Sequence, residues 1–327
     1  AEINKSGTSW NVKILADKLA PATAANLIKK YKLPLDPKAQ HYVSLKVACA
    51  VADKARREKK HVLFFVHGYN NDMKDALSRA IDFERRYNVV CIVFSWPANG
   101  GGAITGTASY KSDKRDARAS AGALERTLMI MQKYFRALTE SNRTRLYALA
   151  LKGNENNPIR RDEVYAELLE KDCPFTVNAI FHSMGNYLLK QTLKSSISEG
   201  GGLLFDNIVL AAADTNNKDH DKWVESLSFR KRCFIAINEN DFALGASRAK
   251  SGSEQLARLG HYLRNLNAAN AHYVNFTEAD DVGRSHGYFG DPSKKNEQVF
   301  AFFKRAFQGE TAEDQLSYNS SGNWYGF

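Results

Sequence analysis

Cysteine is scarce in this sequence, and its spacing excludes the common zinc-binding patterns. The cysteines stand far apart in apolar stretches, at Cys49, Cys91, Cys173 and Cys233. They lack the CxxC and Cys/His spacings through which many proteins bind zinc. We therefore predict buried free thiols, no metal site and no cofactor.

Long hydrophobic runs are also absent. No stretch approaches the roughly 18 consecutive apolar residues of a membrane span, and the N-terminus has no apolar core of a signal peptide. We therefore expect a cytoplasmic protein. The sequence begins at Ala1 rather than Met, so it leaves open whether a leader was removed.

A long basic run interleaved with aromatic residues is missing too, although the formal net charge is +10. Such a charge attracts phosphate backbones and acidic membrane surfaces. The basic residues are scattered, with short clusters only at 54–60 and 230–232. We therefore expect no nucleic-acid partner. Peripheral contact with a membrane stays open, and the sequence does not reveal the oligomeric state.

The composition is that of an ordinary globular enzyme. Hydrophobic residues make up 43% of the 327 residues and charged residues 25%, enough to build one large core. We predict a main domain over 61–308, with an insertion at about 141–172 that is either a cap or surface decoration. Residues 1–60 are expected to pack on this domain, and 309–327 to cross its surface as an extended tail.

Apolar runs rich in β-branched and aromatic residues alternate with amphipathic stretches. Runs this short and this apolar are typical of strands that are buried on both faces of a parallel sheet. The predicted strands are 62–66, 89–94, 175–181, 208–213 and 233–237, with a shorter and more polar edge strand at 272–276. Helical spacing recurs between them, for example in 72–87 and 117–138. The pattern predicts an α/β fold, a doubly wound and mostly parallel sheet with helices on both faces.

A serine follows one of these strands directly. Ser183 stands between the predicted strand 175–181 and a helical pattern, which is the setting of a nucleophile elbow. Gly185 fits this turn, because a side chain there would block the approach of strand and helix. The usual pattern is G-x-S-x-G, and Phe181 stands at its first glycine position, so we expect either a small neighbour or a distorted turn.

A second turn supports this interpretation. The predicted strand 62–66 ends in His67-Gly68-Tyr69. In hydrolases with a nucleophile elbow, a backbone amide in this loop and the amide after the nucleophile form an oxyanion hole. We therefore predict that the amides of Tyr69 and Met184 are the oxyanion donors.

These motifs resemble the α/β-hydrolase superfamily of esterases and lipases. Residues 65–70 (FVHGYN), 93–97 (VFSWP) and 182–186 (HSMGN) are similar to a bacterial family of predicted esterase- and lipase-like hydrolases. The resemblance covers roughly residues 62–289. It implies the α/β-hydrolase fold, a hydrolytic serine, and the chain order serine, acid, histidine.

That order selects the other catalytic candidates. His286 follows the last predicted strand in a loop where such folds place the general base. Asp241 and Asp214 each follow a strand, so either can orient the imidazole, and Asp241 is preferred because it stands one strand before the histidine. Trp96 and Tyr69 are expected to form an apolar wall for the substrate.

The predicted function is hydrolysis of a small-molecule or lipid carboxylic ester through an acyl-enzyme intermediate. A lipase, thioesterase or amidase would use the same triad of Ser183, His286 and Asp241. The alternative from another class is a binding protein that keeps the hydrolase fold without catalysis, and Phe181 is the residue that favours it.

Overall fold

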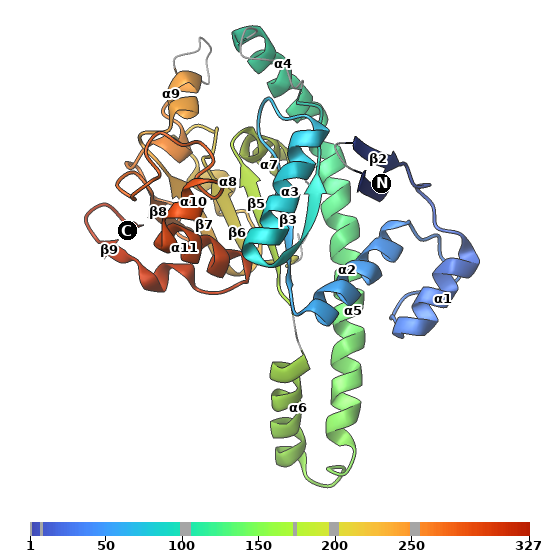
Figure 1. Cartoon of the computed structure of the whole chain (residues 1–327). Helices are drawn as coiled ribbons and strands as arrows, with labels where there is room; N and C mark the ends of the chain where they lie inside the picture. The colour runs from blue at the N-terminus through green and yellow to red at the C-terminus, as the bar shows by residue number, and fades with distance from the viewer. Residues whose placement is uncertain (1, 7–8, 99–105, 173–174, 196–202, 249–255) are drawn as a thin grey trace. The chain divides into compact units, whose positions relative to one another are not determined.

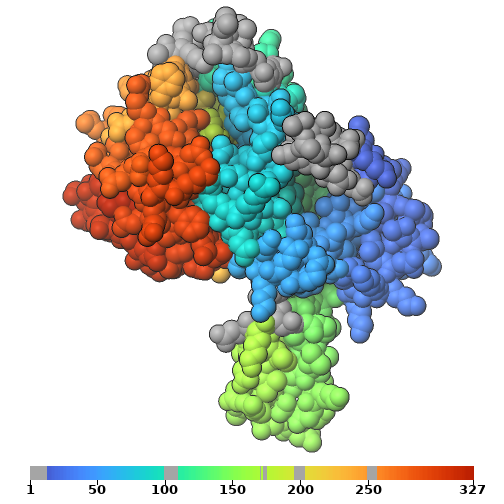
Figure 2. Space-filling view, in the orientation of Figure 1, coloured from blue at the N-terminus to red at the C-terminus, as the bar shows by residue number. Residues whose placement is uncertain are grey.

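The chain divides into two units in the computed structural model (Figure 1; Figure 2 in space-filling view), which describes all residues except 1, 7–8, 99–105, 173–174, 196–202 and 249–255. The first unit comprises residues 1–60 and 127–175, and the second comprises 61–126 and 176–327. All residues predicted to take part in catalysis belong to the second unit.

An eight-stranded sheet forms the centre of the second unit. Its strands are β3 (His61–Val66), β4 (Val89–Phe94), β5 (Val177–His182), β6 (Phe205–Ala211), β7 (Phe229–Ile237), β8 (His272–Asn275), β9 (Ser317–Asn319) and β10 (Trp324–Gly326). They lie in the order β4-β3-β5-β6-β7-β8-β10-β9, and every neighbouring pair is parallel except β10 with β9. The predicted doubly wound, mostly parallel sheet is therefore confirmed.

Helices cover the sheet, and alternate strand residues face different partners. The helices of this unit are α3 (Met73–Tyr87), α4 (Gly106–Ala119), α7 (Met184–Ser195), α8 (Asp221–Val224), α9 (Phe242–Arg248), α10 (Pro292–Lys295) and α11 (Glu297–Phe307). Leu63 and Phe65 of β3 belong to the same core cluster as residues of α3 and α11. Between them in sequence, Phe64 packs instead against Phe181 of β5. Both faces of the strand are thus buried, as its apolar run predicts.

The C-terminal segment adds strands to the sheet. The sequence predicts an extended tail after residue 308, but β9 and β10 pair with each other, and β10 pairs with β8. This pairing corrects the prediction that 272–276 is an edge strand, because β8 lies between β7 and β10.

The first unit contains a β-hairpin and helices. Its elements are β1 (Glu2–Ser6), β2 (Ser9–Lys13), α1 (Pro21–Tyr31), α2 (Ser44–Glu58), α6 (Pro158–Asp172) and most of α5 (Ala121–Leu151). The Tyr31 hydroxyl at the end of α1 donates a hydrogen bond to Asp53 on α2. The backbone N–H of Tyr42 donates to the Tyr134 hydroxyl on α5 at 3.0 Å. Over the described part of the chain, no helix combines the length and apolar character needed to span a membrane.

Several histidines of the second unit have pKa values that the fold lowers. Burial lowers the pKa of His61, His67 and His220 from the ordinary value of 6.5 and lowers that of His182 well below it. In the unfolded chain these imidazoles take up a proton near pH 6.5, whereas in the folded chain they do so only at lower pH. The folded state therefore binds fewer protons than the unfolded state in this window.

We accordingly predict that the free energy of unfolding falls as the pH is lowered from 7.5 to 5.5. Each histidine that only the unfolded state protonates contributes a slope of about 1.4 kcal/mol per pH unit. Urea unfolding followed by circular dichroism at several pH values measures this slope, and His220→Gln should reduce it. A free energy of unfolding that stays constant over this range would contradict the prediction.

Candidate functional site

Ser183 occupies a strained turn at the carboxyl end of β5. Its φ angle is 52°, in the left-handed region that residues other than glycine seldom adopt. The turn is the junction between β5, which ends at His182, and α7, which begins at Met184. The Ser183 N–H donates to the carbonyl of Ala211 on β6 at 3.0 Å. A strained serine between strand and helix is the geometry of a nucleophile elbow.

Two glycines let other backbone segments approach this turn. A Cβ added to Gly68 would lie 2.7 Å from the Cβ of Ser183, and one added to Gly185 would lie 2.8 Å from the carbonyl oxygen of His67. Any side chain at either position would therefore push the His67-Gly68 loop away from the serine. Gly68 comes from the loop after β3, so this loop and the serine turn lie in close contact.

Phe181 does not fill the space beside the serine. Its side chain is fully buried in the sheet core, edge-on to Phe64 with the ring centroids 6.4 Å apart. The side chain of Asn186 holds the turn instead, since its Nδ2 donates to the carbonyl oxygens of Phe181, Ser183 and Ala211 at 2.8, 3.2 and 3.2 Å. The sequence motifs do not reveal this role of Asn186. A polar residue in the first turn of an apolar helix is the feature that could have indicated it.

His286 and Asp241 lie together. The His286 Nδ1 donates to the Asp241 Oδ2 at 2.7 Å. The other carboxylate oxygen of Asp241 accepts from the backbone N–H groups of Ala243 and Leu244 in α9, at 2.9 and 3.0 Å. Asp241 is therefore buried with both oxygens engaged, and the imidazole that it holds has its Nε2 left as the basic nitrogen.

Asp214 lies in a different polar network. Its carboxylate accepts from the Tyr110 hydroxyl at 2.9 Å and the Ser247 hydroxyl at 2.7 Å. It also pairs with the buried guanidinium of Arg258, with 3.1 Å between Nε and Oδ1. These partners of the Asp214 carboxylate link α4, α9 and the loop after β6, and His286 is not one of them.

His182 connects the serine turn to the histidine loop. Its Nε2 donates to the backbone carbonyl of His286 at 3.0 Å, and the two imidazole centroids are 4.7 Å apart. The opposite ring nitrogen, Nδ1, faces Gly68, since a Cβ on that glycine would lie 3.3 Å from it. Burial, reinforced by the neighbouring His286, holds the pKa of His182 well below 6.5. The ring is therefore neutral, with its proton on Nε2.

His67 and Trp96 fix the loop that carries Tyr69. The His67 Nδ1 donates to the Gly68 carbonyl at 3.0 Å, and the Trp96 backbone N–H donates to the His67 Nε2 at 3.2 Å. The Trp96 indole N–H donates to the His67 carbonyl at 2.9 Å, and the two rings are stacked. Trp96 is only 3% exposed, which favours a positioning role over the predicted contact with substrate.

Of the two predicted oxyanion residues, Tyr69 lies in this fixed loop and Met184 begins α7. The Tyr69 side chain is partly exposed, with its ring edge-on to that of Tyr110 at 5.7 Å. Met184 is fully buried, and its backbone N–H belongs to the first turn of the helix. The N–H groups of a first helical turn have no partner within the helix, which suits them to bind a negative charge.

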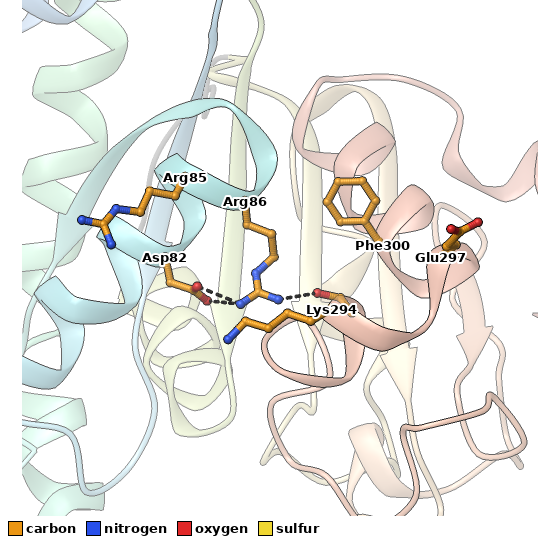
Figure 3. Close-up of a pocket in the computed structure, with 7 residues that line it drawn as sticks. Asp82, Arg85, Arg86, Lys294, Glu297 and Phe300 are labelled. Atoms are coloured by element: carbon orange, nitrogen blue, oxygen red, sulfur yellow. Dashed lines mark hydrogen bonds and ion pairs between the residues drawn. The ribbon is translucent and has the colours of Figure 1, made fainter.

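The segment after His286 is hydrogen-bonded to α3 through Arg86. Figure 3 shows Arg86 between Asp82 and α10, where its guanidinium donates to Asp82 at 2.7 and 2.8 Å and to the Ser293 hydroxyl at 3.1 Å. It also donates to the Gly290 carbonyl at 2.5 Å. A hollow of about 470 Å³ opens here, lined by Asp82, Arg85, Arg86, Ser293, Lys294, Glu297 and Phe300. None of the predicted catalytic residues lines this hollow.

Metal ligands are not grouped in the described residues. No set of three or more His, Cys, Asp and Glu side chains lies close enough there to hold an ion.

One family model matches the chain, over residues 47–140, and its description is alpha/beta hydrolase of unknown function (DUF900). The match includes the His67-Gly68 loop and Trp96 but ends before Ser183. Neither the curated proteins nor the solved structures gave a match. The description of this family agrees with the order and direction of the strands, which are those of an α/β-hydrolase fold, and it suggests hydrolase activity.

Proposed function

We propose that this protein is a serine hydrolase that cleaves carboxylic esters through an acyl-enzyme intermediate. The observation that carries the proposal is the 2.7 Å hydrogen bond from His286 to the buried carboxylate of Asp241. The serine of the elbow, at φ 52°, directly follows His182, whose ring donates a hydrogen bond to the backbone carbonyl of His286. A buried aspartate that fixes a histidine tautomer near a strained serine is the arrangement of a catalytic triad.

Each residue has a defined part in this mechanism. The Ser183 hydroxyl attacks the ester carbonyl while the His286 Nε2 takes its proton, and the imidazolium then gives that proton to the leaving alcohol. Asp241 keeps the Nδ1 protonated and stabilises the positive charge on the ring. The backbone N–H groups of Tyr69 and Met184 stabilise the oxyanion. A water molecule, activated by the same imidazole, then releases the acid.

The burial of Phe181 supports catalysis over the alternative of a binding protein. Phe181 is the departure from G-x-S-x-G that favoured a non-catalytic role, but its ring lies in the core and leaves the serine turn clear. Lipid esters, thioesters and amides use the same groups, and ester cleavage is the least demanding of these reactions to detect. We therefore place esters first.

His182 acts as a positioning residue in this proposal. It donates to the backbone of His286 on one side and lies against Gly68 on the other. It therefore sets the spacing between the loop that supplies the base and the loop that supplies an oxyanion donor. A neutral ring is required for this role, because a charge next to His286 would make the general base less basic.

The first prediction concerns the nucleophile. Wild-type protein should hydrolyse p-nitrophenyl acetate or butyrate, and Ser183→Ala should lower kcat at least about 10³-fold, since no other group supplies the attacking oxygen. Release of p-nitrophenol measures the rate, and circular dichroism checks that the variant is folded. Unchanged hydrolysis by the alanine variant would remove Ser183 from the mechanism.

The second prediction separates the two aspartates. Asp241→Asn should lower kcat by a factor on the order of 10⁴, because the amide favours the wrong imidazole tautomer. Asp214→Asn should instead destabilise the fold by about 3 kcal/mol or more, since it leaves the buried Arg258 without its carboxylate. Its folded fraction should retain turnover. The opposite assignment of effects in paired kinetic and melting measurements would move the acid to Asp214.

The third prediction tests the positioning role of His182. His182→Leu removes the donor to the His286 carbonyl and should lower kcat about tenfold with KM nearly unchanged, which corresponds to one hydrogen bond. His182→Gln carries an N–H at a similar reach and should recover most of the loss. If the leucine and glutamine variants show the same kcat, the hydrogen bond does not position the base.

A further inference from the structure

The net charge of the chain is concentrated in one segment. Residues 13–60 contain twelve Lys and Arg but only four Asp and Glu. The second unit, residues 61–126 and 176–327, contains 25 basic and 24 acidic residues and is close to neutral. The proposed ester hydrolysis makes no use of this asymmetry, so the basic segment calls for a separate explanation.

Part of this charge lies where α1 and α2 meet. Tyr31 at the end of α1 donates to Asp53 on α2, and the Lys30 ammonium lies 3.9 Å from the same carboxylate. Further basic residues flank this contact in sequence, and none of them is buried. We define the basic surface as Lys29, Lys30, Lys32, Lys54, Arg57 and Lys59. Two carboxylates of α2 lie among these residues in sequence: Asp53, which is 3.9 Å from Lys30, and Glu58, which pairs with Arg57 and Lys60.

Helix stabilisation explains only part of this charge. Lysine and arginine in a last helical turn interact favourably with the helix dipole, and both helices have them there. Lys46, however, lies in the first turn of α2, where a positive charge is unfavourable. Neither α1 nor α2 has an acidic residue in its first turn. The segment is thus more basic than the stability of its helices requires.

Exposed apolar side chains accompany the basic ones. Val47, next to Lys46 on α2, is 41% exposed, and Ile14 before α1 is 88% exposed. Residues 13–60 contain no Phe or Trp; Tyr31 and Tyr42 are partly buried, and the Tyr31 hydroxyl donates to Asp53. Single-stranded nucleic acids are usually bound through exposed aromatic rings. Basic and aliphatic side chains together are instead typical of contact with anionic lipid.

We propose that the basic surface binds the anionic headgroups of a lipid membrane. Each lysine or arginine near such a surface contributes attraction that falls off within about 10 Å at 0.1 M salt. This proposal rests on the first unit alone, and it holds whether or not Ser183 is a nucleophile.

Sedimentation with lipid vesicles tests the proposal on the full-length protein. At about 0.1 M salt the protein should bind phosphatidylcholine vesicles that contain about one-third phosphatidylserine, and it should not bind phosphatidylcholine alone. About 0.5 M salt should weaken binding at least tenfold. The variant with Lys29→Gln, Lys32→Gln, Arg57→Gln and Lys59→Gln should also lose at least about tenfold.

A matched control variant removes the same charge from the second unit. Lys74→Gln, Lys218→Gln, Lys295→Gln and Lys304→Gln together should leave vesicle binding within about twofold of wild type, since these lysines are exposed but lie outside the basic surface. Turnover of a soluble p-nitrophenyl ester and circular dichroism check that both variants are folded.

Three results would overturn the proposal. They are equal binding to vesicles with and without phosphatidylserine, an equal loss in the control variant, and tighter binding to duplex DNA than to the anionic vesicles at the same salt. The last result would assign the basic surface to nucleic acid.

Discussion

The close approach of two backbone segments at Ser183 is the constraint on which the rest of the site depends. The serine keeps a φ of 52° because Gly68 and Gly185 leave no side chain in the way and Asn186 binds the carbonyls around the turn. Strain of this kind costs on the order of 1–3 kcal/mol, and it persists only where the surroundings enforce it. In this fold the enforcement comes from neighbouring parallel strands, whose carboxyl ends meet at one edge of the sheet.

Two buried carboxylates at that edge have different partners. Asp241 holds His286, whereas Asp214 neutralises Arg258 and accepts hydroxyl hydrogen bonds from α4 and α9. The separation matters because a carboxylate engaged by a guanidinium would be a poor partner for the imidazolium that the proposed mechanism requires. The network around Asp214 therefore stabilises the surroundings of the site. In the proposed mechanism, Asp241 orients His286.

The sequence predicts the sheet better than the details of the site. Strands buried on both faces must be apolar throughout, so β3 to β7 are visible as runs, whereas β10 escapes notice because three residues carry no period. The pairing of β10 with β8 depends on contacts between distant residues. Trp96 and His182 show the same limit, because their motifs give their positions but only the folded chain decides that their rings face His67 and His286.

Covalent labelling tests directly whether the Ser183 hydroxyl is an activated nucleophile. A fluorophosphonate reacts with a serine that an adjacent base activates, and it spares an ordinary hydroxyl. Intact-mass analysis of the folded protein should show one stoichiometric adduct, and peptide mapping should place it on Ser183. An unlabelled protein, or an adduct on another residue, would contradict the assignment of Ser183 as the nucleophile.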